Sequence, residues 1–296
     1  MQTPTVYVLG AGGQLGRALA GTRPDTAPMI ALTSREADLT DPASLRAALS
    51  GLRAGDVVIN AAAYTNVDAA ETDRDAAFAV NAEGAAHLAT VTGAAGARLI
   101  HVSTDYVFGP HTPAAAPLEP GDLDPADPPA TVYGASKLAG ETAITDRDPG
   151  AVIVRTAWVY TGYDGAPDFV GTMRRLERER DTVSVVDDQR GSPTYAPDLA
   201  AGLWELAGSD VHGTVLHAVN AGDGTWYDLA CGVFTGLGAD PQRVRPCTTD
   251  EFPRPAPRPR YSVLSGRSWA QAGLTPLRDW HDALTAALAG PPATSG

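Results

Sequence analysis

The sequence predicts an α/β protein built on a doubly wound parallel sheet, with a smaller C-terminal α/β cap. Three observations carry this prediction. Short apolar runs alternate with stretches of helical pattern, the runs are continuously apolar, and a glycine-rich turn joins the first run to the first helix. Continuous apolar strands are typical of a parallel sheet that helices cover on both faces. The fold class is therefore of the Rossmann type, with ligands expected at the carboxyl ends of the strands.

The first half of the chain supplies the predicted sheet. Its strands are rich in β-branched and other apolar residues, and they cover residues 5–9, 29–33, 56–60, 98–103 and 151–156. The helical patterns between them cover residues 14–20, 42–52, 69–95 and 132–144. A stretch with seven prolines, residues 110–130, is predicted as a loop, because proline fits neither a helix interior nor a central strand.

The second half is less regular and is predicted to form the cap. Helices are expected over residues 168–180, 196–207, 226–236 and 277–289, and strands over 183–186 and 214–219. Because no flexible linker divides the chain, we assign residues 1–156 mainly to a cofactor domain and 157–290 mainly to a substrate-binding cap. Some strands and helices are expected to be exchanged between the two, and residues 291–296 to form a frayed tail.

Composition excludes several classes of protein. The 296 residues are 44% apolar and 19% charged, and no apolar run approaches the roughly 18 residues that a membrane helix needs. With 22 basic and 35 acidic residues the net charge is −13, which disfavours nucleic acid and anionic membranes as partners. The two cysteines are too few for a disulfide framework, and we expect a cytoplasmic protein.

The glycine loop predicts a dinucleotide site. Gly10, Gly13 and Gly16 form G-x-x-G-x-x-G between a strand and a helix. The first glycine permits the tight turn, the second lets a diphosphate approach the helix N-terminus, and the third allows close helix packing. Glycine clusters also mark simple turns, but the strand–turn–helix setting favours cofactor binding.

The residues after the second strand bear on whether the cofactor is NADPH or NADH. Ser34 and Arg35 favour NADPH, since an arginine accommodates a 2′-phosphate, whereas Glu36 leaves NADH open. Asp38 and Leu39 are placed near the adenine. The alternative for each charge is a solvated loop.

A Y-x-x-x-K pattern supplies the predicted chemistry. Tyr133 and Lys137 share one helical face, and a nearby ammonium is expected to bring the tyrosine pKa toward neutrality. Tyr133 would then donate a proton to a carbonyl oxygen. Thr104, with Ser103 as its alternate, offers a second hydrogen bond from the end of the fourth strand. Asn81 is expected either to hold a water molecule for proton relay or to bond neighbouring backbone.

These motifs resemble the extended branch of the short-chain dehydrogenase/reductase family. The glycine loop, NAAA at residues 60–63, STDYVF at 103–108 and Y-x-x-x-K occur in the order of that family. Within it, NAAAYTNVD at 60–68, VYGASKLAGE at 132–141, RTAWVY at 155–160, DQRGSPT at 188–194, TWYD at 225–228 and RPRYSVL at 258–264 resemble the dTDP-4-dehydrorhamnose reductase family. The resemblance spans essentially the whole chain.

The resemblance implies reduction of the C4 ketone of dTDP-4-dehydro-β-L-rhamnose by NADPH, with NADH possible, to give dTDP-L-rhamnose. Carried over by position, the catalytic residues are Thr104, Tyr133 and Lys137. The implied cofactor residues are Gly10, Gly13, Gln14, Leu15, Gly16, Ser34, Arg35, Asp38, Leu39, Ala61, Ala62, Ala63, Tyr133 and Lys137. The implied substrate residues are Thr65, Val67, Thr104, Tyr106, Trp158, Arg190 and Arg258, with Arg260 as an alternate near the diphosphate.

Alternatives and departures from the family pattern stay open. Ala18 stands where relatives that dimerise through magnesium place a carboxylate, so we expect no metal and a monomer or weak homodimer. A dehydratase is disfavoured because Tyr106, not glutamate, follows Asp105. The remaining alternatives are a reductase or epimerase acting on another dTDP-deoxysugar, or a non-catalytic subunit similar to the regulatory β-subunit of methionine adenosyltransferase.

Overall fold

A computed structural model describes residues 3–112 and 116–290, and its centre is a parallel sheet. The six strands are β1 (Val6–Leu9), β2 (Met29–Leu32), β3 (Val57–Asn60), β4 (Arg98–Thr104), β5 (Val152–Thr156) and β10 (Thr214–His217), in the order β10-β5-β4-β3-β1-β2. All neighbouring strands of this sheet pair in parallel. The strand order reverses between β1 and β3, which creates the switch point where such sheets bind ligands. The predicted fold class is confirmed.

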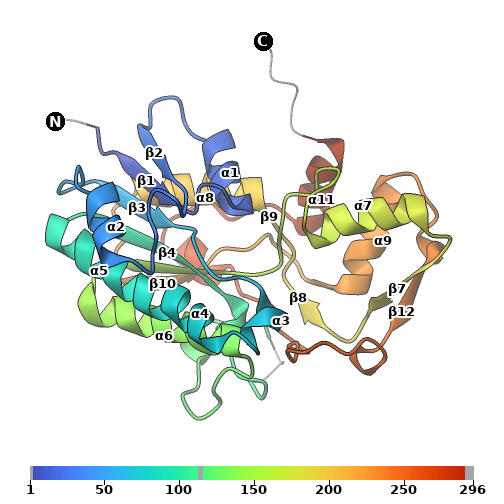
Figure 1. The fold of residues 1–296 in the computed structure, drawn as a ribbon. Coiled ribbons are helices and arrows are strands. Elements are labelled where there is room, and N and C mark those ends of the chain that lie inside the picture. The colour runs from blue at the N-terminus through green and yellow to red at the C-terminus, as the bar shows by residue number, and fades with distance from the viewer. Residues whose placement is uncertain (1–2, 113–115, 291–296) are drawn as a thin grey trace.

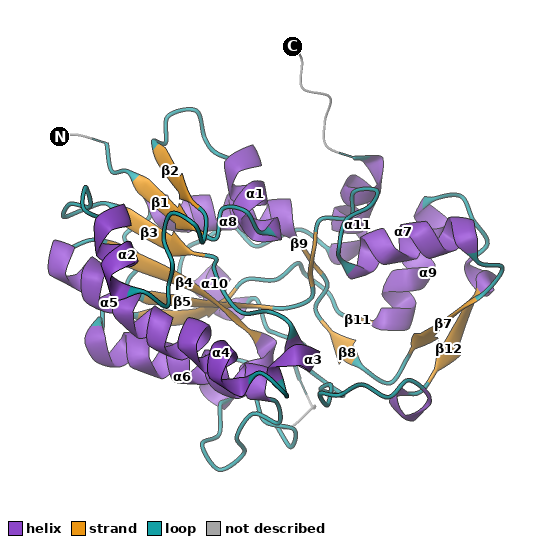
Figure 2. Ribbon diagram, viewed as in Figure 1, coloured by secondary structure: helices purple, strands orange, loops and turns teal. Residues whose placement is uncertain are grey.

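Helices cover both faces of the sheet (Figure 2). One face packs on α2 (Pro42–Ala48), α5 (Gly84–Ala95) and α6 (Val132–Arg147), and the other on α1 (Gln14–Gly21), α8 (Ala196–Gly208) and α10 (Arg267–Gln271). Trp204 of α8 joins the second layer to α1, since its indole N–H donates to the backbone oxygen of Leu19 at 2.9 Å. Because β10, α8 and α10 come from the second half of the chain, that half supplies part of the sheet layer as well as the cap.

The helix expected over residues 69–95 is divided in the structure. It consists of α3 (Val67–Ala70), α4 (Arg74–Phe78), a π-helical stretch over Ala79–Glu83, and α5. Asn81 lies in the π-helical stretch, and its side chain bonds the backbone N–H and carbonyl of Tyr64 and the hydroxyl of Ser136. These long-range bonds explain the local widening of the helix, which periodicity alone does not predict. Asn81 thus bonds neighbouring backbone, one of its two predicted roles.

The cap has its own apolar core. It is formed by α7 (Phe169–Glu179), α9 (Trp226–Gly236), α11 (Trp280–Ala289) and the parallel pair β7 (Val183–Val186) and β12 (Val244–Cys247). Two further pairs of short strands connect cap and sheet layer: β6 (Val159–Tyr160) with β9 (Thr194–Tyr195), and β8 (Arg190–Gly191) with β11 (Gly224–Thr225). The sequence analysis missed these strands, because two residues carry no periodicity. Short 3-10 helices lie at Asp105–Val107, Pro120–Asp122, Pro241–Arg243 and Thr249–Glu251.

Two other predictions concern connecting segments. Within the described part of the proline-rich stretch, the 3-10 helix Pro120–Asp122 is the regular element, and the rest is loop. The predicted tail, residues 291–296, lies outside the described residues. Among the described helices, none combines the length and the apolar character that crossing a membrane requires.

Candidate active site

A cavity of about 1220 Å³ lies between the carboxyl edge of the sheet and the cap. It is large enough for two nucleotide-sized ligands, since single drug-sized sites occupy roughly 300–1,000 Å³. It brings together these sequence-predicted residues: Gly10, Gly13, Gln14, Leu15, Ser34, Ala61, Ala62, Ala63, Thr65, Val67, Thr104, Tyr106, Tyr133, Lys137 and Trp158. Gly16, Arg35, Asp38, Leu39, Arg190 and Arg258 do not line it.

The glycine loop has the geometry that a diphosphate cradle needs. Gly10 adopts a φ of +78°, and a Cβ there would lie 2.6 Å from the backbone nitrogen of Ala62. A Cβ on Gly16 would lie 2.3 Å from the Gly10 oxygen, so Gly16 acts by letting α1 pack against the turn. Helix α1 begins after Gly13 with no side-chain cap, which leaves its first N–H groups directed at the cavity rim. This uncapped helix start beside small residues fits a dinucleotide phosphate.

The end of β2 favours NADPH over NADH. The Glu36 carboxylate accepts from the backbone N–H of Thr33 at 2.7 Å and from its hydroxyl at 2.8 Å, so it closes a local turn. Ser34 lines the cavity together with Arg17 of α1, a cation that the sequence analysis missed. Arg17 lies on the first turn of α1, one residue after Gly16, and that position was the available signal.

Asp38 and Leu39, predicted near the adenine, do not line the cavity and instead contact neighbouring parts of the protein. Asp38 accepts hydrogen bonds from the Thr40 hydroxyl and backbone N–H, which lower its pKa. Leu39 is buried against Gly84, where a Cβ would lie 2.7 Å from the Leu39 Cβ.

Thr104 ends β4 with its hydroxyl already engaged. Its Oγ1 donates to Asp105 Oδ1 at 3.0 Å and accepts from the backbone N–H of Tyr106 at 3.3 Å. Asp105 is buried, and this burial raises its pKa to about 6 against the hydrogen bonds from Ser262 and Thr104. The Thr104 proton must therefore turn away from Asp105 before it can be donated to a substrate oxygen.

The structure corrects the expected ionisation of Tyr133. Burial raises the pKa of its phenol to about 12, while a hydrogen bond with Thr104 opposes this and the nearby Asp105 adds to it. Lys137 does not bring this pKa toward neutrality, because its Nζ is directed at β4. Tyr133 thus remains a protonated phenol at neutral pH, which suits a proton donor.

The Lys137 side chain extends from α6 toward β4, where two groups contact its Nζ. Its Nζ lies 2.8 Å from the backbone oxygen of Val102 and 3.1 Å from His101 Nε2. Burial lowers the pKa of Lys137 to about 8, and Glu141 one turn further on opposes this. Glu141 itself is bound to Arg155 of β5 at 2.7 Å.

Aromatic side chains line the cavity in two groups, and the pair Trp158 and Trp226, the latter on α9, forms its cap end. The Trp158 and Trp226 rings stack with centroids 3.6 Å apart and planes 8° from parallel, and the Tyr106 ring meets the Tyr133 ring edge-on at 5.5 Å. Trp158 has a φ of +46°, an unusual conformation for a bulky residue and a frequent feature of functional sites. Val67 packs in the same apolar cluster as Tyr106 and Tyr133, and Thr65 also lines the cavity. Trp226 was not predicted as a site residue; its place in the TWYD segment was the available signal.

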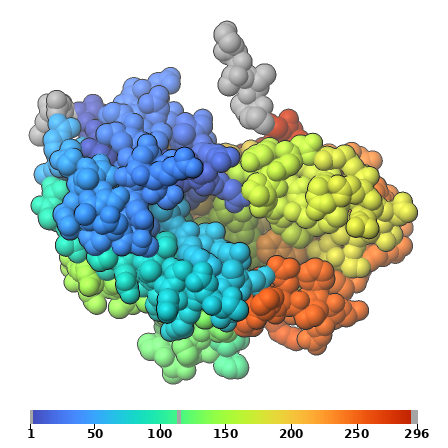
Figure 3. Space-filling model, in the orientation of Figure 1, coloured from blue at the N-terminus to red at the C-terminus, as the bar shows by residue number. Residues whose placement is uncertain are grey.

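The two predicted substrate arginines are paired with carboxylates. Arg258 bonds Asp68 at 2.8 Å, where Arg254 also binds, so the segment after β12 meets α3 across the two layers (Figure 3). Arg190 of β8 pairs with Asp223. Their predicted roles at the diphosphate remain predictions.

Asp168 connects the cap to the sheet layer at the cavity, and the sequence analysis did not predict it as a site residue. It caps α7, accepts from the Thr161 hydroxyl at 2.7 Å and from Gln14 Nε2 at 3.2 Å. The sequence signal was an aspartate directly before a helical pattern.

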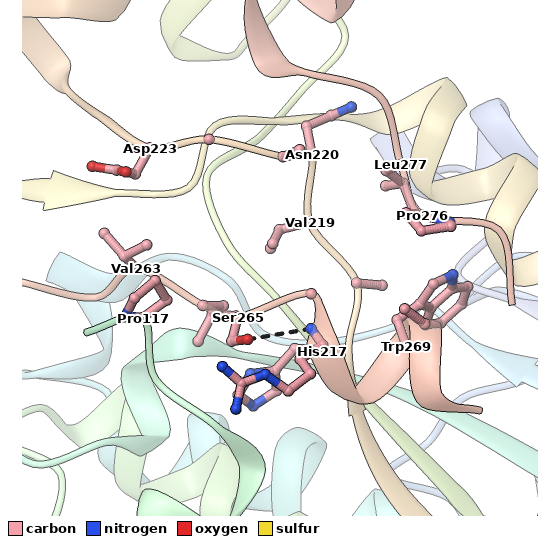
Figure 4. Close-up of a pocket in the computed structure, with 17 residues that line it drawn as sticks. Pro117, His217, Val219, Asn220, Asp223, Val263, Ser265, Trp269, Pro276 and Leu277 are labelled. Atoms are coloured by element: carbon pink, nitrogen blue, oxygen red, sulfur yellow. Dashed lines mark hydrogen bonds between the residues drawn. The ribbon is translucent and has the colours of Figure 1, made fainter. Parts of the chain in front are cut away.

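A second cavity of about 390 Å³, shown in Figure 4, is not lined by Thr104, Tyr133 or Lys137. His217, Asn220, Ser265 and Trp269 are among its lining residues. In the described parts of the chain, no three histidine, cysteine or acidic side chains gather as metal ligands would.

Comparison with known proteins places the chain in a family. The sequence model of the RmlD substrate binding domain matches residues 4–290. A dTDP-4-dehydrorhamnose reductase from Mycobacterium tuberculosis is 55% identical, with 97% of this chain and 93% of that protein covered. A dTDP-4-keto-6-deoxy-D-glucose reductase from Streptomyces niveus is 44% identical, with 95% of each covered.

A solved structure supports the same placement. The dTDP-4-dehydrorhamnose reductase from Bacillus anthracis, crystallised in complex with NADP, is 34% identical with a TM-score of 0.85, and 96% of this chain and 98% of that chain are covered. The chain therefore belongs to the dTDP-4-dehydrorhamnose reductase family.

Proposed function

We propose that this protein reduces the C4 ketone of dTDP-4-dehydro-β-L-rhamnose with NADPH to give dTDP-L-rhamnose. The observation that carries the proposal is the single cavity that joins the glycine loop, the Thr104–Tyr133–Lys137 trio and the aromatic cap end. Relatives of the same family carry the reductase name over nearly the full length of the chain.

The proposed reaction forms one C–H bond and one O–H bond. When bound, NADPH supplies the hydride that reduces the carbonyl carbon and is itself oxidised to NADP⁺. Tyr133 gives its phenolic proton to the carbonyl oxygen, so the ketone becomes an alcohol and Tyr133 is left as a phenolate that solvent reprotonates. Thr104, once turned from Asp105, donates a hydrogen bond to the oxygen on which negative charge develops.

The other chain groups bind and orient. The α1 N-terminus fits the cofactor diphosphate, and the small side chains of Ala61 to Ala63 let the cofactor lie close to the backbone. Ser34 and Arg17 fit a 2′-phosphate. Thr65, Val67, Tyr106 and Trp158 fit the sugar, because an aromatic face suits the apolar side of a pyranose. We assign residues 1–156 mainly to cofactor binding and 157–290 mainly to substrate binding, with β10, α8 and α10 exchanged into the sheet layer.

The test is substrate-dependent oxidation of NADPH by the wild type and by Tyr133→Phe. We expect turnover to fall by about 10²–10⁴-fold, the range for removal of a general acid, with NADPH affinity retained. Turnover of Tyr133→Phe within a few-fold of wild type would remove Tyr133 from the mechanism. Failure of the wild type to oxidise NADPH with this sugar would remove the reductase assignment.

A second candidate is reduction of another dTDP-4-keto-6-deoxysugar. The relative from Streptomyces niveus, named as a dTDP-4-keto-6-deoxy-D-glucose reductase, favours it. Supplying the 4-keto sugar with and without a 3,5-epimerase, and identifying the product by NMR, separates the two.

We further propose a cytoplasmic monomer or weak homodimer that binds neither nucleic acid nor membrane. The net charge of −13 and two free cysteines, Cys231 and Cys247, support this. Sedimentation with and without magnesium tests the oligomeric state, since Ala18 offers no carboxylate to a bridging metal.

A further inference from the structure

Three buried side chains, from β3, β4 and α6, form a chain of hydrogen bonds. Asn60 Nδ2 lies 3.0 Å from His101 Nδ1, and His101 Nε2 lies 3.1 Å from Lys137 Nζ. Asn60 and His101 are register partners on neighbouring strands. All three residues are at most 1% exposed, so water does not replace any of these hydrogen bonds. The direction of each bond is therefore set by the protein itself.

The Asn60 end of the chain fixes the tautomer of His101. Asn60 Oδ1 accepts from the backbone N–H of Ala62 at 3.1 Å, so the amide nitrogen faces the imidazole. An amide nitrogen only donates, which makes His101 Nδ1 an acceptor. Burial, and next Lys137, hold the pKa of His101 well below its usual range, so the ring is neutral. The single ring proton must then lie on Nε2.

The Nε2 proton points at Lys137 Nζ, where an ammonium has no lone pair to accept it. A neutral amine satisfies both contacts, since it accepts from His101 and donates to the Val102 oxygen at 2.8 Å. Among the titratable groups, Glu141 on α6 acts on the charge of Lys137, and Arg155 on β5 pairs with Glu141. Tyr133 and Asp105 line the same cavity as Lys137. Glu141 is neutralised by its bidentate bond to Arg155, which leaves the amine form accessible near the lowered pKa of Lys137, about 8.

We propose that His101 is a positioning residue that holds Lys137 as a neutral amine in the cofactor-free enzyme at mildly alkaline pH, and that Lys137 takes up a proton when NADPH binds. The second clause rests on the proposed function. The proton comes from solvent and adds to the Nζ lone pair that His101 releases, and no electron is transferred. Lys137 lines the cavity to which the cofactor phosphates would add negative charge, and this charge favours the ammonium form.

The first experiment is the 15N–1H spectrum of the histidine rings in the cofactor-free protein at a pH of about 9, above the pKa of Lys137. His217 is an internal control of opposite type: its Nδ1 lies 3.0 Å from the Leu118 carbonyl and must carry the proton. We expect an Nε2–H tautomer for His101 and an Nδ1–H tautomer for His217, with the signals assigned by loss in His101→Gln and His217→Gln. An Nδ1–H or doubly protonated His101 overturns the proposal.

The second experiment uses Asn60→Asp to reverse the direction of the hydrogen bonds between residue 60, His101 and Lys137. A carboxylate only accepts, so the proton must move to His101 Nδ1, Nε2 becomes an acceptor, and Lys137 must donate as an ammonium. Calorimetry of NADPH binding in buffers of different ionisation enthalpy, all at a pH of about 9, should show proton uptake close to one per site for wild type and close to none for Asn60→Asp. Unchanged uptake in this variant overturns the proposal.

Asn66→Asp is the matched control. Asn66 Oδ1 caps α3 by accepting from the backbone N–H of Ala69, a role that aspartate also fills, and we expect wild-type proton uptake. A wild type that does not bind NADPH would count against the proposed function, whereas the tautomer of His101 in the cofactor-free protein decides the positioning role independently.

Discussion

Gly191→Ala is expected to weaken substrate binding by displacing Trp158. A Cβ built on Gly191 lies 2.4 Å from Trp158 Cε2 and 2.5 Å from Cζ2. Carbon atoms in contact sit roughly 3.5–4.0 Å apart, so the indole must move by about 1 Å. Gly191 has an ordinary φ for an alanine, which makes the effect purely steric.

The ring has little room to yield. One face stacks on Trp226, and the backbone of Trp158 is held at a φ of +46°. Overpacking of this kind costs about 1–3 kcal/mol. If that free energy is lost from substrate binding, the KM for the sugar nucleotide rises by roughly 5- to 150-fold, because 1.4 kcal/mol is tenfold.

Steady-state kinetics with both substrates, and fluorescence titration with NADPH, measure the effect. We expect the KM of the sugar nucleotide to rise while the Kd of NADPH stays within about twofold, since Gly191 contacts Trp158, at the cap end of the cavity. Gly93→Ala is the matched control, because a Cβ at this α5 position meets nothing within 4 Å. A Gly191→Ala enzyme with an unchanged KM for the sugar nucleotide would refute the role of Trp158 as a substrate platform.

Further predictions concern stability and pH. Burial, followed by Arg155, lowers the pKa of His217 to about 3, so the folded ring stays neutral while the unfolded ring charges below about 6.5. The contribution of His217 to the unfolding free energy should therefore fall by about 2–3 kcal/mol between neutral pH and pH 4.5. In urea titrations His217→Gln should lose this part of the dependence and keep the part that comes from His101, whose pKa is also lowered. An unaltered slope would contradict this. Arg155→Met leaves Glu141 buried and unpaired and should lower the unfolding free energy by about 3–5 kcal/mol, whereas Arg175→Ala, which breaks an exposed pair, should change it by less than about 1 kcal/mol. Equal losses in the two variants would show that burial does not decide the strength of these pairs.

Local patterns in the sequence determined the sheet layer and the main site motifs. The apolar runs that became β1, β3, β4 and β5, and the glycines after β1, are properties of neighbouring residues, so periodicity and turn chemistry are enough to predict them. The spacing of Tyr133 and Lys137 is likewise a property of one helix. The family motifs, read in order, led to the reductase family that the comparisons confirmed.

Tertiary structure decided how those residues are ionised and paired. The pKa of Tyr133 rises and Lys137 faces His101, because burial and a neighbouring strand outweigh the spacing along α6. Arg258 meets Asp68 from nearly two hundred residues away. Desolvation and long-range contacts depend on which segments the fold places together, and a linear pattern carries no record of that.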